Sequence, residues 1–312
     1  MPNEDIEGKT KIIQEIEDPN LVRIVTKNVL TANDAEIKAS ISGIADEKTA
    51  QTCNIFKLLK QHNIPTAYQS RNDNNSFIAK KCKMVPIECV IRRRPYGSYF
   101  KRHPDAVVDQ TFDPLLLEFY HKHAVVVPRI QRRVPRYKNN LQIQHLPENE
   151  IKWSDTNTTD SPDPSFSGVD IFTDPLIEFD QNPEAIATGV WHLYPAKQPR
   201  TANQEPLYKI VPVVGDEEIY FIKNSLMIPT FEVIENAWKK FNVTLVDMKI
   251  EVGYTRDGEL VVSDVIDNDS WRIHPNGDPK QQLDKQAFRD APSKLSVVEE
   301  NYKTVTQYTN KF

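Results

Sequence analysis

The sequence lacks several features that would place it in a specialised class of protein. It has three cysteines in 312 residues, Cys53, Cys82 and Cys89, which are too few and too irregularly spaced for a disulfide framework or a zinc site. No apolar run approaches the ~20 residues that a membrane-spanning helix needs. The first residues are polar and acidic, so no secretory signal is expected. A cytoplasmic protein without a membrane partner is the expectation.

Glycine and an excess of positive charge are also lacking. The chain has 9 Gly against 22 Pro, and 39 Lys and Arg against 44 Asp and Glu give a net charge of −5. This balance argues against a protein that coats nucleic acid or an anionic membrane with its whole surface. Hydrophobic residues make up 39% of the chain, which is enough apolar material for a core of one large domain or two modest ones.

The order of the predicted elements favours an α+β fold rather than a regular βαβ alternation. Strands are predicted at 12–13, 21–25, 77–79 and 87–94. Apolar residues at helical spacing predict a helix over 44–61, which ends before Pro65. Pro229 is expected to begin a second helix, and strands at 243–254 and 259–266 precede helical segments that close the chain.

The stretch from about 125 to 215 differs in composition and periodicity from the rest of the chain. It opens with a basic run, made of Arg129, Arg132, Arg133, Arg136 and Lys138. From 148 to 174 it is rich in Asp, Ser, Thr and Pro with little periodicity, which predicts a loop or a partly mobile insertion. Strands are expected within it at 190–194 and 208–214.

The segment LVDMKIEV predicts a strand with a charged face, because alternation places Asp247, Lys249 and Glu251 on one side. The Asp-Gly pair at 257–258 favours a two-residue hairpin turn, in which Glu251 would face Asp264. Two opposed carboxylates repel each other. Mg²⁺ bound to nucleotide phosphates would reverse that repulsion. The alternative interpretation is a pair of solvated surface acids.

A second polar group lies at 87–98, in IECVIRRRPYGS. As a strand, this segment would place Arg92 and Arg94 on one face, with Ser98 at a following turn. Guanidinium groups and a hydroxyl suit phosphate or carboxylate, and the alternative is a solvated basic edge strand. A third segment, EGKTK at 7–11, is similar to a short phosphate clamp but lacks the spacing of a P-loop.

Taken in order, these segments resemble the SAICAR synthetase family of purine-pathway ligases. The likeness lies in EGKTK at 7–11, in FIAKKCKMVPIECVIRRRPYGSYFKRHP at 77–104 and in TLVDMKIEVGY through QAFRD at 244–290. It is strongest to the animal version, in which this domain is fused to AIR carboxylase. The resemblance implies a small β-rich nucleotide-binding lobe at 1–90 and a larger α/β lobe at 91–312, with the ATP site in the cleft between them. The insertion at about 125–215 would interrupt the larger lobe.

The resemblance implies a ligase that uses ATP and Mg²⁺ to join the carboxylate of CAIR to the amino group of L-aspartate, giving SAICAR. A carboxylate is a poor electrophile, and phosphorylation supplies its leaving group while cations neutralise the transferring charge. Small molecules are therefore the expected partners, and nucleic acid is not. A homo-oligomer, or an association with other purine-pathway enzymes, stays open.

The resemblance also implies roles for individual residues. It assigns ATP to Lys9, Lys11, Met84 and Glu88, and Mg²⁺ at ATP to Glu251 and Asp264. It assigns CAIR to Arg92 and Ser98, and the rest of the substrate side to Asp247, Lys249, Asp269, Arg272 and Lys285. The expected catalytic residues are Asp247, Lys249 and Asp264.

The chain departs from the family pattern after Phe119. Where the family has Asp-Ala followed shortly by Asp-Pro, this sequence has YHKHAVVVP, so His123 replaces a metal-binding acid. A neutral His123 could still bind a metal, although the lost charge weakens a site for Mg²⁺. An acid from the insertion, at 174–175 or 178–180, could substitute. Gly43-Ile44 likewise replaces a usual Gly-Lys at the helix start.

Three functions stay open at the level of the sequence. The first is a working ligase, and the second is a diverged paralogue that binds nucleotide with little or altered ligase activity, which the changed acidic motif favours. The third is a binding protein whose basic insertion at 129–138 contacts RNA or an acidic partner. Because Tyr137 is the one aromatic residue within that run, a solvated basic loop is the competing explanation.

Overall fold

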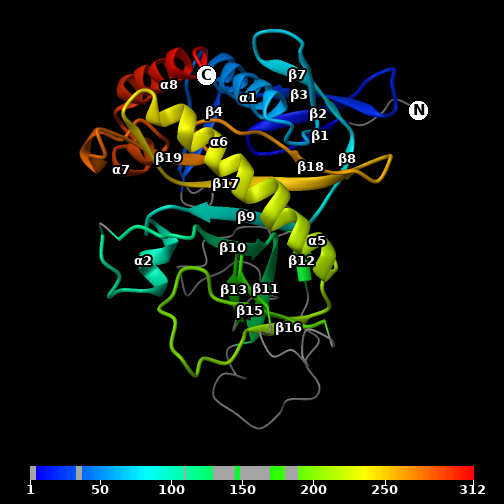
Figure 1. The fold of residues 1–312 in the computed structure, drawn as a ribbon, viewed down its shortest axis with the longest axis vertical. Helices are drawn as coiled ribbons and strands as arrows, with labels where there is room; N and C mark the ends of the chain where they lie inside the picture. The colour runs from blue at the N-terminus through cyan, green and yellow to red at the C-terminus, as the bar shows by residue number, and fades with distance from the viewer. Residues whose placement is uncertain (1–4, 33–36, 109, 129–144, 148–168, 180–188) are drawn as a thin grey trace.

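The computed structural model describes residues 5–32, 37–108, 110–128, 145–147, 169–179 and 189–312. Its helices and antiparallel sheets confirm the α+β class (Figure 1). Among these residues, no helix is long and apolar enough to cross a membrane. The three cysteines are free thiols.

The N-terminal sheet carries the EGKTK segment at one edge. Its strand order is β1-β2-β3-β7-β6. The bounds are β1 (Ile6–Glu7), β2 (Lys11–Glu15), β3 (Leu21–Thr26), β6 (Tyr68–Arg71) and β7 (Ser76–Lys80). A two-stranded sheet, β4 (Val29–Ala32) and β5 (Ile37–Ser40), follows β3 and leads into the first helix.

Helix α1 (Ile44–Gln61) has the predicted bounds. Its predicted apolar face is buried, with Phe56 and Leu59 almost fully covered, because the 3.6-residue period turns these positions to one side. Helix α8 (Leu295–Thr309) lies alongside it (Figure 1), and the Gln51 amide donates to the Tyr302 carbonyl at 3.0 Å.

The large sheet carries most of the predicted site residues. Its strand order is β16-β15-β14-β10-β9-β17-β18, and β8 and β19 also pair with β17. The bounds are β8 (Cys82–Met84), β9 (Ile87–Arg92), β10 (Leu116–His121), β14 (Leu176–Phe179), β15 (Trp191–Tyr194), β16 (Tyr208–Ile210), β17 (Val243–Thr255), β18 (Leu260–Ser263) and β19 (Trp271–Pro275). Strand β17 is central, because it pairs with β9 and β19 near its start and with β18 and β8 near its end.

One face of this sheet is covered by a helical segment that crosses β17 (Figure 1). It consists of α5 (Asp216–Phe221), η3 (Ile222–Met227) and α6 (Ile228–Lys239). The prediction that a helix begins at Pro229 is confirmed to within one residue, because α6 begins at Ile228, whereas the preceding α5 and η3 were not predicted. Pro229 lies in the first turn of α6, directly after the π-helical segment η3, where the regular hydrogen-bond ladder is already altered and a missing N–H costs less.

The middle stretch is more regular than its sequence suggested. Strand β13 (Val169–Phe172) forms where a loop was expected and pairs with β11 (His123–Pro128), which also pairs with β12 (His145–Pro147). Pairing with a neighbouring strand outweighs weak local propensity in such short segments. The basic run at 129–138 and residues 148–168 lie outside the described residues.

Short elements complete the fold, namely α2 (Ser98–Arg102), η4 (Pro279–Gln281) and α7 (Gln286–Asp290). The division into lobes at residue 90 stays a prediction. Several contacts cross it, among them the pairing of β8 with β17 and the packing of α8 against α1.

Candidate active site

The β17–β18 hairpin has a different register from the predicted one. Glu251 pairs with Ser263 rather than with Asp264. The turn has three residues instead of two, since Thr255 N donates to Glu259 O at 2.9 Å and Gly258 takes a φ of 82°. A glycine in the left-handed region is typical of such three-residue loops. Asp264 therefore lies one position beyond the ladder, directly after β18.

Glu251 and Asp264 nevertheless belong to one group of charges, which we call the lysine–carboxylate cluster. It consists of three ammonium groups and three carboxylates, from Lys11, Lys122, Lys249, Glu88, Glu251 and Asp264. Lys249 Nζ lies 2.8 Å from Glu88 Oε1 and 3.0 Å from Glu251 Oε1. Lys122 Nζ lies 2.6 Å from Glu251 Oε2, and Lys11 is ion-paired with Asp264. Since the Glu251 side chain is only 7% exposed, the alternative of solvated surface acids is wrong for Glu251.

The pKa values in the cluster reflect this mutual neutralisation. Burial alone would raise the pKa of Glu251, but Lys249, Lys122 and Lys11 outweigh it and hold that pKa well below its ordinary value. Burial would likewise lower the pKa of Lys249, and Glu88 with Glu251 raises it instead. For Lys11 burial prevails, helped by the two other lysines, and its pKa falls to about 8.

The two remaining residues assigned to ATP border the cluster. Lys9 is exposed in the turn between β1 and β2, where Gly8 N donates to Lys11 O at 2.9 Å. Met84 pairs with Gly253 at the end of β8 and is 38% exposed, which is unusual for methionine. An exposed apolar side chain beside a cationic group gives this edge both parts of a nucleotide site, one for a base and one for phosphates.

A second group of charges, which we call the arginine cluster, surrounds Asp247. This residue pairs with Arg92 on one side and with Arg272 on the other, because β17 lies between β9 and β19. Arg92 Nη1 lies 2.5 Å and Arg272 Nη1 lies 2.7 Å from Asp247 Oδ2. Ser98 joins the cluster by accepting from Arg92 Nη2 at 3.1 Å.

Arg92 is not on a solvated edge strand, so that alternative is wrong. It is 2% exposed on a strand flanked by β10 and β17, and its Nε donates to Glu118 at 2.7 Å. The strand ends at Arg92 rather than at Arg94, because the N–H groups of Arg93 and Arg94 both donate to Val246 O. Arg93 turns to the opposite face and bonds Glu235 on α6 at 2.8 Å.

The sequence analysis missed the residues that support Arg92 from behind. They are Glu118, Tyr120 and Arg102, all buried, with Tyr120 donating to Glu118 at 2.8 Å and Arg102 ion-paired with it. The signal in the sequence is a glutamate between Leu117 and Phe119 in an apolar strand. A buried carboxylate needs a cationic partner, so this glutamate could have indicated the contact with Arg92.

A third group, which we call the Asp269 cluster, brings together Asp269 and Lys285 as predicted for one side of the site. Lys285 Nζ lies 3.2 Å and Lys48 Nζ lies 2.8 Å from Asp269 Oδ2, and Tyr302 OH donates to the same carboxyl group. Burial opposes ionisation of Asp269, but the two lysines outweigh it and keep its pKa below the ordinary value. Lys48 was missed, although it lies one helical turn after Ile44 on the buried face of α1.

The three clusters interact with one another. Asp247, Lys249 and Glu251 alternate along β17 and so point to the same side of the sheet. Arg289 is within electrostatic reach of both Asp247 and Asp269. The lysine–carboxylate and arginine clusters are therefore neighbours along β17, and Arg289 links the arginine cluster to the Asp269 cluster electrostatically.

Among the described residues, the segment after Phe119 holds no cluster of metal-binding side chains. His123 is half-buried, and its ring lies edge-on to the ring of His121, with 5.0 Å between the ring centroids. Glu178 accepts from Arg200 at 2.8 Å, and Asp180 lies outside the described residues. In the part of the chain that the structure describes, no group of three or more His, Cys, Asp or Glu could hold a metal. Glu251 and Asp264 fit Mg²⁺ only as a pair that shares the ion with phosphate oxygens, which is its usual binding mode with nucleotides.

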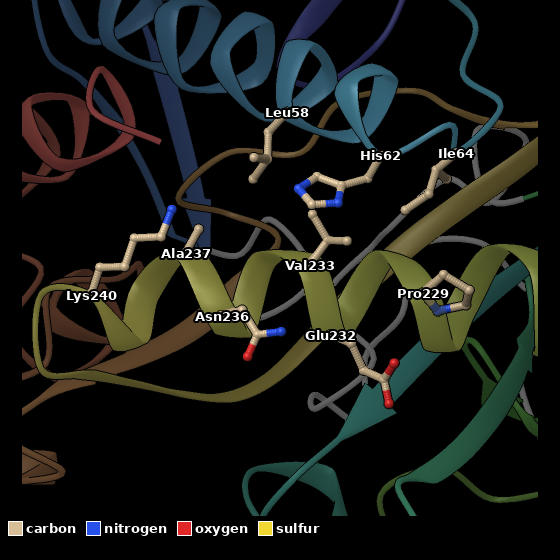
Figure 2. A pocket seen from close by; sticks show the side chains of 9 residues that line it. All are labelled: Leu58, His62, Ile64, Pro229, Glu232, Val233, Asn236, Ala237 and Lys240. Carbon is tan, nitrogen blue, oxygen red and sulfur yellow. The ribbon is translucent and has the colours of Figure 1, made fainter.

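A hollow of about 370 Å³ lies elsewhere, between α1 and α6 (Figure 2). Leu58 and His62 face Val233 and Ala237 across it. None of the predicted site residues, all within the described part of the chain, lines this hollow. The residues that line this hollow belong to none of the three clusters.

The fold and these clusters define an α+β protein in which a lysine-rich cluster lies beside an arginine-rich one. A family model described as SAICAR synthetase matches residues 5–128 and 198–308, which is more than half of the chain. The chain therefore belongs to the SAICAR synthetase family, as the resemblance of its motifs predicted. Residues 129–197, which the match leaves out, lie within the stretch at 125–215 that the sequence sets apart.

Similar proteins come from bacteria and from animals. A phosphoribosylaminoimidazole-succinocarboxamide synthase of Chloroflexus aurantiacus is 31% identical over 311 residues, covering 98% of this chain and 95% of the bacterial protein. The "Multifunctional protein ADE2" of Gallus gallus is 30% identical over 96% of this chain, which spans 56% of the chicken protein. A solved structure described as "SAICAR synthetase (Type-2) in complex with ADP" has the same fold, with a TM-score of 0.68 at 22% identity over 99% of this chain and 98% of that chain.

Proposed function

We propose that this chain is a phosphoribosylaminoimidazole-succinocarboxamide synthase, which joins the carboxylate of CAIR to L-aspartate at the expense of ATP. The observation that carries the proposal is the arrangement along β17. Glu251 and Lys249 belong to the lysine–carboxylate cluster, and Asp247, two positions earlier, belongs to the arginine cluster. A phosphoryl donor and a carboxylate acceptor bound to these clusters would be neighbours, as the transfer between them requires.

On the nucleotide side, the ammonium groups of Lys9 and Lys11 would bind phosphates and Met84 would border the base. Glu88 keeps Lys249 in place between the two clusters. Glu251 and Asp264 would hold Mg²⁺ together with the phosphates. The ion, when bound, neutralises charge on the transferred phosphoryl group.

On the acceptor side, Arg272 offers the clearest contact for an anion. Its Nε is a buried donor without a hydrogen-bond partner among the described residues, and such a group calls for a ligand or water. Ser98 and the outer edge of Arg92 lie beside it. We assign CAIR to this group, with Asp247 fixing the two guanidinium groups.

For the second substrate we assign the Asp269 cluster. Lys48 and Lys285 carry two ammonium groups beside Asp269, and their remaining donors suit an anionic substrate group. The reaction then has two steps. A CAIR carboxylate oxygen takes the γ-phosphoryl group and ADP leaves. The aspartate amine then attacks the acyl carbon, loses a proton and expels phosphate as the C–N bond forms.

The proposal includes small-molecule partners and a cytoplasmic location, with association with other purine-pathway activities supported by the multifunctional name of the chicken relative. A second candidate, a nucleotide-binding paralogue with little ligase activity, is favoured by one observation. Lys122 bonds a carboxylate that the ligase would need for Mg²⁺.

Conversion of CAIR, L-aspartate and ATP to SAICAR, followed by mass spectrometry, tests the proposed ligase. The matched variant is Asp264→Asn, because asparagine tolerates the left-handed backbone found there (φ 63°) and removes only the charge. We expect wild type to form SAICAR and Asp264→Asn to be slower by about 10²-fold or more. A wild type that binds ADP but forms no SAICAR would leave the second candidate.

A further inference from the structure

Lys122 belongs to the lysine–carboxylate cluster, although the sequence analysis did not predict it as a site residue. It is the single residue between β10 and β11, and its N–H donates to Pro86 O at 3.0 Å. This bond fixes the turn beside the start of β9. The side chain reaches across to β17 and places Nζ 2.6 Å from Glu251 Oε2.

With Lys122 in this position, both oxygens of Glu251 are bound by ammonium groups. Lys249 takes Oε1 and Lys122 takes Oε2, and Asp264 is bound by Lys11. The cluster has three positive and three negative charges, so its net charge is zero. A divalent cation approaching Glu251 would meet no excess negative charge and would have to displace Lys122 first.

Lys122 is also able to meet a ligand. Its side chain is 34% exposed, whereas that of Glu251 is 7% exposed. An ammonium group has three donors, and one bond to Glu251 leaves two for phosphate oxygens. A cation that binds a protein carboxylate on one side and phosphate on the other acts as Mg²⁺ does in such sites, with one charge instead of two.

We propose that Lys122 is a built-in cation that takes the position of a divalent metal at Glu251, so that this chain binds nucleotide phosphates without Mg²⁺. The inference rests on the nucleotide part of the proposed function. The inference concerns nucleotide binding, for which the single charge of Lys122 is enough. Phosphoryl transfer still gains from the larger charge of Mg²⁺. Mg²⁺ must then compete with Lys122 for the carboxylate.

The test is the affinity of the full-length chain for ADP, measured by titration calorimetry in excess EDTA and in excess Mg²⁺. For wild type we expect the two dissociation constants to agree within about threefold, which is less than 1 kcal/mol. For Lys122→Met we expect the affinity in EDTA to fall about tenfold, equal to about 1.4 kcal/mol, and Mg²⁺ to restore it. Lys57→Met, which removes an exposed lysine of α1, should behave as wild type.

The outcomes are distinct. Wild-type binding of ADP that is lost in EDTA would overturn the inference and leave the proposed function intact, and this comparison needs no variant. Equal metal dependence of wild type and Lys122→Met, with both folded, would also overturn it. Absence of ADP binding in both media would overturn the nucleotide site and the inference together. Binding in EDTA without SAICAR formation would overturn the ligase alone.

Discussion

At the scale of single residues, the site depends on side chains that bind one another before they bind any substrate. The guanidinium group of Arg92 donates to Glu118, Asp247 and Ser98 while it is nearly inaccessible to solvent. Removing it takes one of two cationic partners from each of two buried carboxylates, Glu118 and Asp247, which keep Arg102 and Arg272 respectively. A buried charge of this kind is costly, so Arg92 serves the stability of the fold as well as the binding of CAIR.

We therefore expect Arg92→Met to lower the free energy of unfolding by about 3–5 kcal/mol, because Glu118 and Asp247 lose a buried cation. Urea denaturation of the purified protein measures it. Arg256→Met is the control, since Arg256 makes an exposed bond to Asn20 and its loss should cost no more than about 0.5 kcal/mol. Equal midpoints for the two variants would contradict the structural role of Arg92.

Gly97 allows a second prediction, because its backbone touches the arginine cluster. It has a φ of 55°, and a Cβ there would lie 2.7 Å from Arg272 Nη2. Gly97→Ala should displace Arg272 and lower kcat/KM for CAIR by about 10²-fold, as small misplacements of binding groups do.

Gly258→Ala separates this effect from backbone strain. Gly258 also has a positive φ, of 82°, but nothing lies within 4 Å of a Cβ there. It should cost about 1–2 kcal/mol of stability and leave kcat/KM unchanged. Similar kinetics for the two alanine variants would mean that the contact between Gly97 and Arg272 does not position the substrate.

The residue types of the site could be predicted from the sequence, but their partners could not. The motif at 87–98 gives Arg92, since guanidinium groups near a glycine turn suit anion binding, and the family resemblance gives Asp247 and Arg272. They do not give Glu118 or Lys122, because these side chains come from β10 and the turn after it. Which strand lies beside β9 is decided by tertiary pairing rather than by any local pattern.

At the scale of elements, the β17–β18 hairpin also shows that the sequence predicts which residues are present better than it predicts which residues they face. Alternation along β17 predicts which residues share a face, and it is confirmed by the contacts of Asp247, Lys249 and Glu251. The turn at Gly258 was predicted one residue too short. An Asp-Gly pair fits both two-residue and three-residue loops, and the choice shifts every pair across the ladder by one position.

The junction between β19 and α7 gives a prediction on pH. The Asp284 carboxyl group accepts hydrogen bonds from the backbone N–H groups of Ile273 and Gln286, at 2.9 and 2.7 Å. Burial raises the pKa of Asp284 from 3.8 to about 6. A carboxyl group whose pKa is raised on folding stabilises the fold fully below its unfolded pKa. That contribution is lost as the pH rises through the folded pKa, and here it amounts to about 3 kcal/mol.

The measurement is the free energy of unfolding of wild type and Asp284→Asn between about pH 4 and pH 7. Asparagine does not ionise, so the advantage of wild type over the variant should shrink by about 3 kcal/mol across this range. Comparing the two proteins removes the opposite trends of Glu251 and Asp269, whose pKa values are lowered. A difference that does not change with pH would show that Asp284 ionises normally in the folded chain.

At the scale of the whole molecule, the three clusters draw residues from the N-terminal sheet, the large sheet and α1. Lys11 comes from the first sheet, Lys249 from the second and Lys48 from the helix. Helix α1 and the long strand β17 were predicted close to their bounds, because helix periodicity and strand alternation are clear there. The short strands β1, β4, β5, β6, β8 and β19 were not predicted. Between residues 94 and 243, strands β15 and β16 and helix α6 were predicted. Strands β10, β11, β13 and β14 were not, because they are short and their pairing is long-range.

The most direct test of the ligase is the release of ADP by the purified chain with ATP and Mg²⁺, with CAIR and L-aspartate added singly and together. A ligase that phosphorylates CAIR and then transfers the acyl group to aspartate turns over only when both are present, so sustained ADP release should require both. Sustained release at the same rate with neither substrate, or none with both, would contradict the assignment of the two neighbouring clusters on β17 to one ligase site.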